Sequence, residues 1–307
     1  VNGYGTGLSP PTTDEWSDIA ENARVVDGIS YRSTSSAVDN SETPWFPPIG
    51  DQGIQGSCTA WAIGYYIKTY QEAKEHNWDL TGATWNGGAP TISYQNKIMS
   101  PAFVYNLINE GTDDGSSFDD AIRLVCNIGV SSWQKMPYYQ ASYTTWPSEA
   151  TWTEAPLYRC NKTYGYQYLY ATDDTGVSSL KNWLAAGNLA VIAVDAYQFY
   201  TLTSADIWTS DNYQTVGLNH ANTIVGYDDD ISYNESGTVH YGAFKVANSW
   251  GMAGWENVND GFYWVSYDAM KELSADNPCW LFQDLVGYQP DLFASFNVDH
   301  SRRDECQ

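Results

Sequence analysis

A glycine-rich loop runs into a helical pattern at Ile49-Gly-Asp-Gln-Gly-Ile-Gln-Gly-Ser-Cys58. Glycines let this backbone take conformations that other residues avoid. From Trp61 to Tyr70 apolar residues recur at helical spacing, which predicts a buried helix from Cys58 to about residue 75. A helix N-terminus stabilises an anion and lowers the pKa of a cysteine there, so Cys58 is a candidate nucleophile. The commoner role of a single cysteine is that of a small buried apolar residue.

The rest of the chain divides into helices followed by strands. The first 45 residues or so are rich in Ser, Thr, Asn, Gly and Pro and predict loops and short strands. Segregated helices and strands indicate an α+β fold with two lobes. The expected helices are 101–109, 117–129 and 180–186, and the expected strands are 189–194, 220–227, 243–248 and 262–265.

The composition limits the partners. With 14 Lys plus Arg against 37 Asp plus Glu, the net charge is −23, so we expect binding neither to nucleic acid nor to anionic membranes. Such a surface favours neutral or basic peptides over acidic ones. No apolar run approaches the length of a membrane span. The acidic cluster 228–230 could bind calcium, but a solvated turn is the favoured interpretation.

Five cysteines leave at least one thiol unpaired. There is no CxxC pair, so we expect no structural zinc site. Two disulfides beside one reactive thiol would suit a secreted or extracellular protein. The chain starts at Val1 without a signal-peptide pattern, so we expect that a signal and pro-segment have been removed or that the chain was cut there. From sequence proximity we expect the pairs Cys126–Cys160 and Cys279–Cys306.

His220 is the candidate base for Cys58. A cysteine nucleophile needs an imidazole within hydrogen-bond reach. Of the four histidines, His76 follows a charged stretch and suggests a solvated helix end, His240 lies near an expected hairpin, and His300 lies in a charged tail. Only His220 has a motif around it, Gly217-Leu-Asn-His-Ala-Asn-Thr-Ile-Val-Gly-Tyr227.

Three further side chains complete the candidate site. Asn248, in Lys245-Val-Ala-Asn-Ser-Trp-Gly251, can orient the imidazole, although a single Asn is normally a turn residue. Trp250 can cover the Cys–His pair and exclude water. Gln52 lies six residues before Cys58, and its side-chain amide can donate to an oxyanion, which is typically worth roughly 3–4 kcal/mol.

Three sequence blocks together resemble the papain/cathepsin family of cysteine peptidases, as a divergent, prokaryotic-type member. They are Asp51-Gln-Gly-Ile-Gln-Gly-Ser-Cys58, Asn219-His-Ala221 with Val225-Gly-Tyr227, and Asn248-Ser-Trp-Gly251. The resemblance implies a papain-like fold, with a mainly helical lobe, a β-barrel-like lobe and the active-site cleft between them. It also implies peptide-bond hydrolysis with Cys58 as nucleophile, His220 as base and acid, Asn248 as orienter and Gln52 in the oxyanion hole.

Weaker likeness extends from about Pro44 to Asp268. It implies substrate contacts at Gly115, Ser116, Asn219 and Trp250. No metal or cofactor is needed, and we expect a monomer that acts on peptides or proteins. The expected domains are an N-terminal arm or pro-segment remnant at 1–43 and a catalytic domain at 44–307, divided into a helical lobe at 44–145 and a β-rich lobe at 146–307.

The chain departs from the family pattern at Gln55, where a cysteine is expected, and at Thr59, where Trp or Tyr is expected. Losing that cysteine removes a bridge the family normally has. The spacing from Cys58 to His220 and Asn248 is longer than expected, which implies insertions, one of them at 228–242.

Two alternatives to hydrolysis remain: a non-catalytic binding protein on this fold, and a thiol acyltransferase or transglutaminase-like enzyme. Endo- versus exopeptidase action and substrate preference stay open. For residues 1–43 we favour a permanent arm over an inhibitory pro-segment, because the segment is short and shows no convincing helix. A new N-terminus near residue 40 after activation at lowered pH would contradict this preference.

Overall fold

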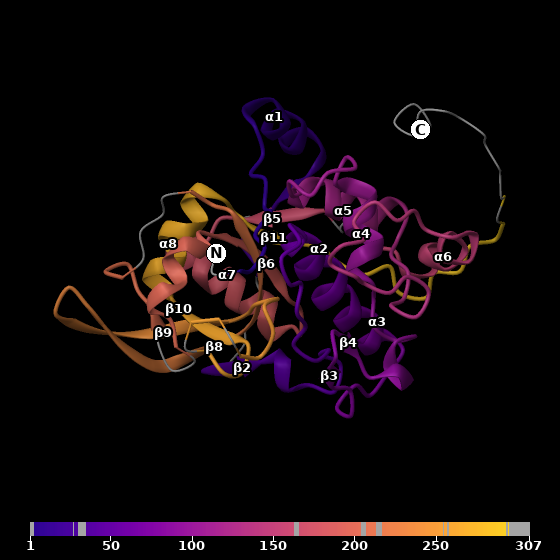
Figure 1. Cartoon of the computed structure of the whole chain (residues 1–307). Helices are drawn as coiled ribbons and strands as arrows, with labels where there is room; N and C mark the ends of the chain where they lie inside the picture. Colours follow the sequence, from indigo (N-terminus) through magenta and orange to yellow (C-terminus); the bar gives the residue numbers. More distant parts are fainter. Residues whose placement is uncertain are drawn as a thin grey trace.

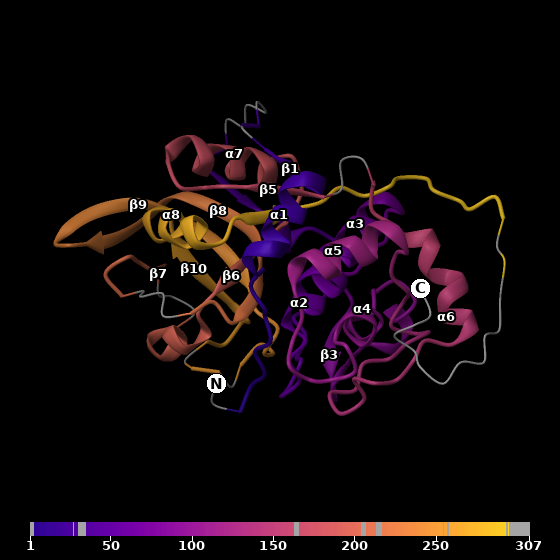
Figure 2. The same ribbon diagram turned by 90° about the horizontal axis from the view of Figure 1, so that it is seen from above.

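The computed structural model describes residues 3–26, 28–29, 35–162, 166–203, 207–212, 217–253, 255–256, 258–292 and 294 (Figure 1). Helices gather on one side of the molecule, and the large sheet with its covering helices lies on the other (Figures 1 and 2). The predicted two-lobe α+β arrangement is therefore confirmed.

One long helical stretch carries Cys58 and forms the centre of the helical lobe. It consists of α2 (Cys58–Ala60), a π-helical segment η2 (Trp61–Lys68) and α3 (Thr69–Glu75), as the apolar spacing predicts. Every residue of η2 is buried, including Lys68. The other elements on this side are β3 (Trp85–Asn86), β4 (Ala89–Pro90), η3 (Ile92–Tyr94), α4 (Pro101–Ile108), α5 (Phe118–Asn127), α6 (Glu149–Glu154) and η4 (Ala155–Tyr158).

Local sequence sets the starts of α4 and α5. The side chain of Ser100 accepts from the N–H of Phe103, and Pro101 occupies the first turn, where a missing N–H costs nothing. Ser117 caps α5 in the same way. Both predicted helices are confirmed. By its contacts α6 lies with the helical lobe, past the boundary expected at residue 145, because Trp152 packs on Phe103.

The second lobe is built on a nine-stranded sheet in the order β1-β5-β11-β6-β8-β9-β10-β7, with β2 also paired to β8. Its long strands pair antiparallel, with His220 opposite Val194. The strands are β1 (Arg24–Val25), β2 (Ala37–Asp39), β5 (Gln167–Leu169), β6 (Ala190–Val194), β7 (Ile207–Trp208), β8 (His220–Glu235), β9 (Thr238–Ala247), β10 (Phe262–Ser266) and β11 (Cys279–Leu281).

Two cores support the lobes. One joins the helical lobe to the inner face of the sheet, through side chains such as Trp61, Phe103 and Val191. The other lies within the β-rich lobe, where Leu180 and Met270 pack on the opposite face of the sheet. The remaining helical elements of this side are η5 (Ala196–Thr201), α7 (Asp174–Ala185) and α8 (Tyr267–Asp276).

The first 45 residues contain a helix that the composition did not indicate. The helix α1 (Thr13–Asn22) begins with a capping box in which Thr12 and Glu15 bond each other's backbone N–H. A short 3-10 turn, η1 (Asn40–Glu42), follows β2. The expectation of loops and strands alone is wrong, because the capping box and the burial of Ile19 stabilise the helix.

Two predicted boundaries also change. Helix α7 begins at Asp174 rather than residue 180, because Asp173 caps it by accepting from the N–H of Gly176. The suspected insertion at 228–242 forms a long β8–β9 hairpin that projects from the lobe (Figures 1 and 2). The acidic cluster therefore lies on a strand, and not in the solvated turn that was favoured. There Lys181 pairs with Asp229 at 2.6 Å.

Candidate active site

His220 and Asn248 form the centre of the candidate site. His220 opens β8, and Asn248 directly follows β9, so the pairing of these two strands brings the side chains together. The Nε2 atom of His220 lies 2.8 Å from Oδ1 of Asn248. Both side chains are fully buried. The structure thus joins the two residues that the sequence predicted as base and orienter.

The neighbours of Asn248 fix the tautomer of His220. Oδ1 of Asn248 accepts from the Asn222 side-chain amide at 2.9 Å and from the Ser249 backbone N–H at 2.7 Å. An atom that receives two N–H donors must be the carbonyl oxygen, so Nε2 of His220 carries a proton and donates to it. The other ring nitrogen, Nδ1, is buried and has no hydrogen-bond partner. It is therefore the basic nitrogen.

Cys58 lies beside this histidine at the start of the long helix. Its thiol hydrogen-bonds the backbone of Ala221, the residue after His220, and the side chain of Thr59. The sequence predicted a lowered pKa at this helix start, but complete burial raises the pKa of the Cys58 thiol to about 12. Burial likewise lowers the pKa of His220 to about 4, although its hydrogen bond to Asn248 opposes that shift. At neutral pH both shifts favour the neutral thiol and the neutral imidazole.

Gln52 contacts the site through its side-chain amide. Nε2 donates to the carbonyl of Gly5 at 3.1 Å and to that of Gln55 at 2.8 Å. Oε1 accepts from the Ser249 hydroxyl at 2.6 Å, which fixes the amide orientation. One N–H of Gln52 therefore donates to the backbone carbonyl of Gly5, a residue near the N-terminus. The amide is thus oriented to donate to a carbonyl oxygen at this position.

Trp250 covers the imidazole. Its ring centroid lies 4.5 Å from that of His220, and its Nε1 donates to the carbonyl of Gly5 at 2.9 Å. Phe199 contacts both rings edge-on. These apolar rings exclude water from the histidine, as the sequence predicted for Trp250, and they contribute to the burial that lowers the pKa of His220.

Residues 3–9, here called the N-terminal arm, lie directly on the candidate site. The arm's Tyr4 stacks on Trp250, with centroids 5.2 Å apart. Backbone hydrogen bonds tie Gly5 to Gly53 and Gly7 to Asn219. These contacts come from both lobes, so the arm lies between them (Figure 2).

The arm approaches so closely that it requires glycine. A Cβ on Gly5 would lie 2.2 Å from the carbonyl oxygen of Gln55. Gly7 has φ +130°, and a Cβ there would lie 2.2 Å from the carbonyl oxygen of Gly56. Any side chain at either position would push the arm away from the loop that precedes Cys58.

The four residues expected to contact substrate all contact the arm in this structure. Ser116 N donates to Gly7 O at 2.8 Å, and Ser116 O accepts from the N–H of Ser9 at 3.1 Å. Gly115, with φ +111°, packs so tightly that a Cβ would lie 2.2 Å from Gly7 O. The carbonyl of Asn219 accepts from both Gly7 and Leu8 at 3.0 Å. The fourth residue, Trp250, stacks on Tyr4 of the arm.

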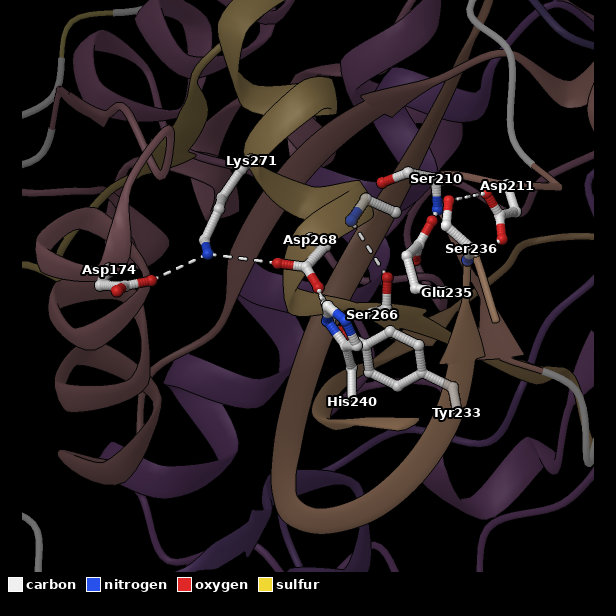
Figure 3. A network of polar contacts seen from close by, with 11 residues as sticks. Asp174, Ser210, Asp211, Tyr233, Glu235, Ser236, His240, Ser266, Asp268 and Lys271 are labelled. Atoms are coloured by element: carbon white, nitrogen blue, oxygen red, sulfur yellow. Dashed lines mark hydrogen bonds and ion pairs between the residues drawn. The ribbon is translucent and has the colours of Figure 1, made fainter. Parts of the chain in front are cut away.

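The other described histidines lie outside the site. His240 on β9 bonds Asp268 at 2.7 Å, within the network of Tyr233, Asp268 and Lys271 in the β-rich lobe (Figure 3). His76 lies at the end of α3, as expected. His300 lies outside the described residues. Among the described histidines, His220 alone lies at the candidate site.

Several positioning residues were missed from the sequence. Asn222 accepts from the hydroxyl of Tyr263 at 2.8 Å while it donates to Asn248. Tyr138 donates to the Gln52 carbonyl at 2.8 Å and bonds the Ser57 hydroxyl. Asn222 could have been found, because residues two apart on a strand share a face, as His220 and Asn222 do. Tyr138 lies 86 residues from Gln52 in the sequence, so no local sequence pattern could indicate this contact.

The described cysteines are all free thiols. Cys126 and Cys160 nevertheless hydrogen-bond each other through their side chains, so the predicted pair is adjacent without being bonded. The partner expected for Cys279, Cys306, lies outside the described residues. Among the residues described, Asp228–Asp230 is not one of the groups whose geometry suits a metal ion.

The sequence model described as papain family cysteine protease matches residues 88–279, well over half of the chain. The chain belongs to the papain family of cysteine proteases. The match includes His220 and Asn248 and begins after Gln52 and Cys58. No curated protein is similar enough in sequence to count as a match.

Solved structures of the same fold include xylellain, a cysteine protease from Xylella fastidiosa, at 21% identity over 92% of this chain and 96% of that one, with a TM-score of 0.64. Digestive procathepsin L2 from the larval midgut of Tenebrio molitor is 20% identical over 92% of this chain and 79% of its own, with a TM-score of 0.65. Bromelain from Ananas comosus, in complex with the E64 inhibitor, is 16% identical over 81% and 99%, with a TM-score of 0.56.

The structure accounts for one departure of this papain-family chain. Where a cysteine is expected, Gln55 donates from its side-chain amide to the Gln140 carbonyl at 2.9 Å. Gln140 in turn accepts from the N–H of Ile54 through its side chain. A pair of hydrogen bonds therefore anchors the loop that a disulfide would otherwise hold. None of the helices in the described part of the chain has the length and apolar character needed to cross a membrane.

Proposed function

We propose that this cysteine peptidase hydrolyses peptide bonds with Cys58 as nucleophile, His220 as base and acid, Asn248 as orienter and Gln52 as oxyanion donor. One observation carries the proposal: His220 is held by Asn248 with its basic Nδ1 unpartnered, beside the thiol that bonds the backbone of Ala221. Thiol, base and orienter are the three parts that covalent acyl transfer requires.

During the reaction one proton passes between the sulfur of Cys58 and Nδ1 of His220. Nδ1 of His220 takes the thiol proton, and the Cys58 sulfur attacks the peptide carbonyl to form a C–S bond. The imidazolium then protonates the leaving amine as the C–N bond breaks. Water, deprotonated by His220, attacks the thioester, and the thiol leaves with the proton.

The oxyanion would lie against the side-chain amide of Gln52. That N–H now donates to the carbonyl of Gly5, so its donor is already aimed at a carbonyl oxygen on this side of the loop. Ser249 and Tyr138 hold Gln52 in place before the reaction begins. A preorganised donor of this kind is typically worth roughly 3–4 kcal/mol in the transition state.

In this scheme the N-terminal arm inhibits the enzyme. It packs on the loop before Cys58 and on Trp250, which covers His220, and it uses the backbone groups of Ser116 and Asn219 that a substrate would need. Strand β2, in contrast, pairs with β8 and belongs to the permanent sheet. Residues 1–43 would therefore combine both expected roles: an inhibitory part that includes residues 3–9, and a permanent strand at residues 37–39.

The proposed setting is secreted or extracellular, with the protein acting as a monomer on neutral or basic peptides. The net charge of −23 supports the preference for such substrates. The digestive procathepsin of similar fold, from a larval midgut, is consistent with an extracellular setting. The proposed domain boundary stays at residue 44, with strand β2 as the part of residues 1–43 that joins the sheet of the catalytic domain.

The test uses the full chain after incubation at lowered pH, beside Cys58→Ala. We expect an epoxide peptide inhibitor to modify Cys58, and a panel of fluorogenic peptides to be cleaved by the wild type only. Adding an amine acceptor separates hydrolysis from acyl transfer, because a transferase would yield mainly the amide product. Substantial cleavage by a clean Cys58→Ala preparation would refute the scheme, and an unreactive Cys58 without turnover would support the non-catalytic alternative.

A further inference from the structure

Three side chains of metal-ligand type gather at the C-terminal end of α3, outside the candidate active site. They are Glu72, Glu75 and His76, and one ligand atom from each lies within 4.8 Å of the others. Their spacing of three and four residues places them on one face of the helix. From the sequence, His76 is expected only as a solvated residue at a helix end.

A fourth group comes from the chain after β11, which runs back across the helical lobe (Figure 2). Asp284 lies within hydrogen-bond reach of Glu75. It shares the ammonium of Lys68 with Glu72: Nζ lies 2.6 Å from Oδ1 of Asp284 and 2.7 Å from Oε1 of Glu72. Two distant segments thus meet around one buried cation.

The second oxygens of these two carboxylates are not satisfied. Oε2 of Glu72 and Oδ2 of Asp284 are buried and have no hydrogen-bond partner. The Glu72 side chain is only 2% exposed, and its Oε2 makes a long ion-pair contact of 3.6 Å with Nε2 of His76 in place of a hydrogen bond. A buried carboxylate oxygen without a donor is costly unless something else binds it.

The charges of the cluster do not balance. Glu72, Glu75 and Asp284 are three acids, and Lys68 supplies one positive charge. Two negative charges remain when all three acids ionise and His76 is neutral, as it must be to bind a metal, and a divalent cation would neutralise them.

We propose that Glu72, Glu75, His76 and Asp284 bind a divalent transition-metal ion of the zinc class. An imidazole combined with carboxylates suits such an ion better than calcium or magnesium, which prefer oxygen ligands alone. The His76 side chain is 36% exposed, so the outer edge of the site is open to an entering ion. The bound ion would fasten the segment after β11 onto the helix that begins at Cys58.

The experiment titrates Zn²⁺ into the metal-free full chain by calorimetry, in a Cys58→Ala background that removes the thiol as a competing ligand. We expect binding of one ion per chain and a Zn²⁺-dependent rise of the unfolding midpoint. Glu75→Gln and His76→Gln should each weaken the affinity at least tenfold and remove most of that rise. Glu21→Gln, the same chemical change on the exposed face of α1, should leave both unchanged.

The visible spectrum of bound Co²⁺ gives a second measurement, because it reports a protein-ligated ion and does not depend on stability. Binding that is equally tight in Glu75→Gln and His76→Gln would overturn the proposal. So would the absence of one-to-one binding, which would mean that a proton shared by Glu75 and Asp284 relieves the excess charge. Either result leaves the proposed peptidase activity untouched, since none of these four side chains contacts Cys58 or His220.

Discussion

His220 donates from Nε2 to Oδ1 of Asn248 over 2.8 Å, and the same oxygen also accepts from Asn222 and from the Ser249 backbone. Three donors on one oxygen leave the amide no freedom to rotate. The imidazole consequently keeps one tautomer and one orientation, with Nδ1 as its only basic atom. The orienter therefore depends on its own neighbours as much as on its contact with the histidine.

Removing the orienter should slow the reaction without preventing substrate binding. We expect Asn248→Ala to lower kcat on the order of 10- to 100-fold, about 1.4 to 2.8 kcal/mol of transition-state stabilisation, with little change in KM. Asn248→Asp should instead move the His220 limb of the pH–rate profile to higher pH, because a carboxylate favours the imidazolium. An unshifted profile in Asn248→Asp would show that the side chain does not contact the catalytic imidazole during turnover.

Sequence patterns predicted the elements that depend on local signals. The helix from Cys58 follows from apolar spacing, and the starts of α4 and α5 follow from Ser100 and Ser117. Helix α1 was missed although Thr12 and Glu15 spell its capping box, because the surrounding polar composition suggested loops. Here a specific hydrogen-bond motif was a better guide than average composition.

The state of the site could not be predicted in the same way. The low pKa expected for Cys58 considered only the helix start, whereas complete burial outweighs that effect. Gly5 and Gly7, about fifty residues earlier in the chain, pack on the loop that precedes Cys58, and no periodicity reports such a contact. Tyr138 holds Gln52 across 86 residues. Long-range contacts therefore decide whether the candidate site is open.

Displacing the arm should activate the intact chain. Gly7→Ala places a Cβ 2.2 Å from the Gly56 carbonyl at a φ that alanine rarely adopts, so the arm should leave the site. We expect labelling of Cys58 by an epoxide inhibitor to accelerate at least tenfold. Ser9→Ala is the control, because it alters an exposed arm side chain and keeps the backbone bond to Ser116. Equal labelling rates in both variants and the wild type would mean that the arm does not restrict access.

Cys126 and Cys160 should form a disulfide in an oxidising glutathione buffer. Their thiols already hydrogen-bond, and Cys160 N donates to the Val125 carbonyl at 3.0 Å. Two thiols would lose two electrons and two protons to oxidised glutathione, which leaves as two reduced molecules. The closed loop should stabilise the fold by about 3–4 kcal/mol on the chain-entropy argument. Non-reducing peptide mapping checks the pair, with Cys279→Ser as control; full alkylation of both thiols after oxidation would contradict it.

The arm should be held most firmly between about pH 6.5 and pH 9. Burial lowers the pKa of His220 from 6.5 to about 4. Below pH 6.5 the exposed histidine therefore binds a proton that the covered histidine does not bind, so acid favours release of the arm. Burial raises the pKa of Cys58 from 9.0 to about 12, so above pH 9 the exposed thiol loses a proton that the covered one keeps, and alkali also favours release. Apart from Cys58, the side chains described against the imidazole are Trp250, Phe199 and Asn248, and these three carry no titratable group.

The measurement compares the Cys58 labelling rate of the wild type with that of Gly7→Ala across the pH range. Dividing one rate by the other removes the intrinsic pH dependence of the thiol reaction, and leaves the fraction of chains whose arm is displaced. Relative to pH 7, this fraction should rise about 60-fold at pH 4.5, because the pKa of His220 is 6.5 when it is exposed and about 4 when it is covered. A ratio that stays flat between pH 7 and pH 4.5 would show that His220 is not protonated when the arm leaves.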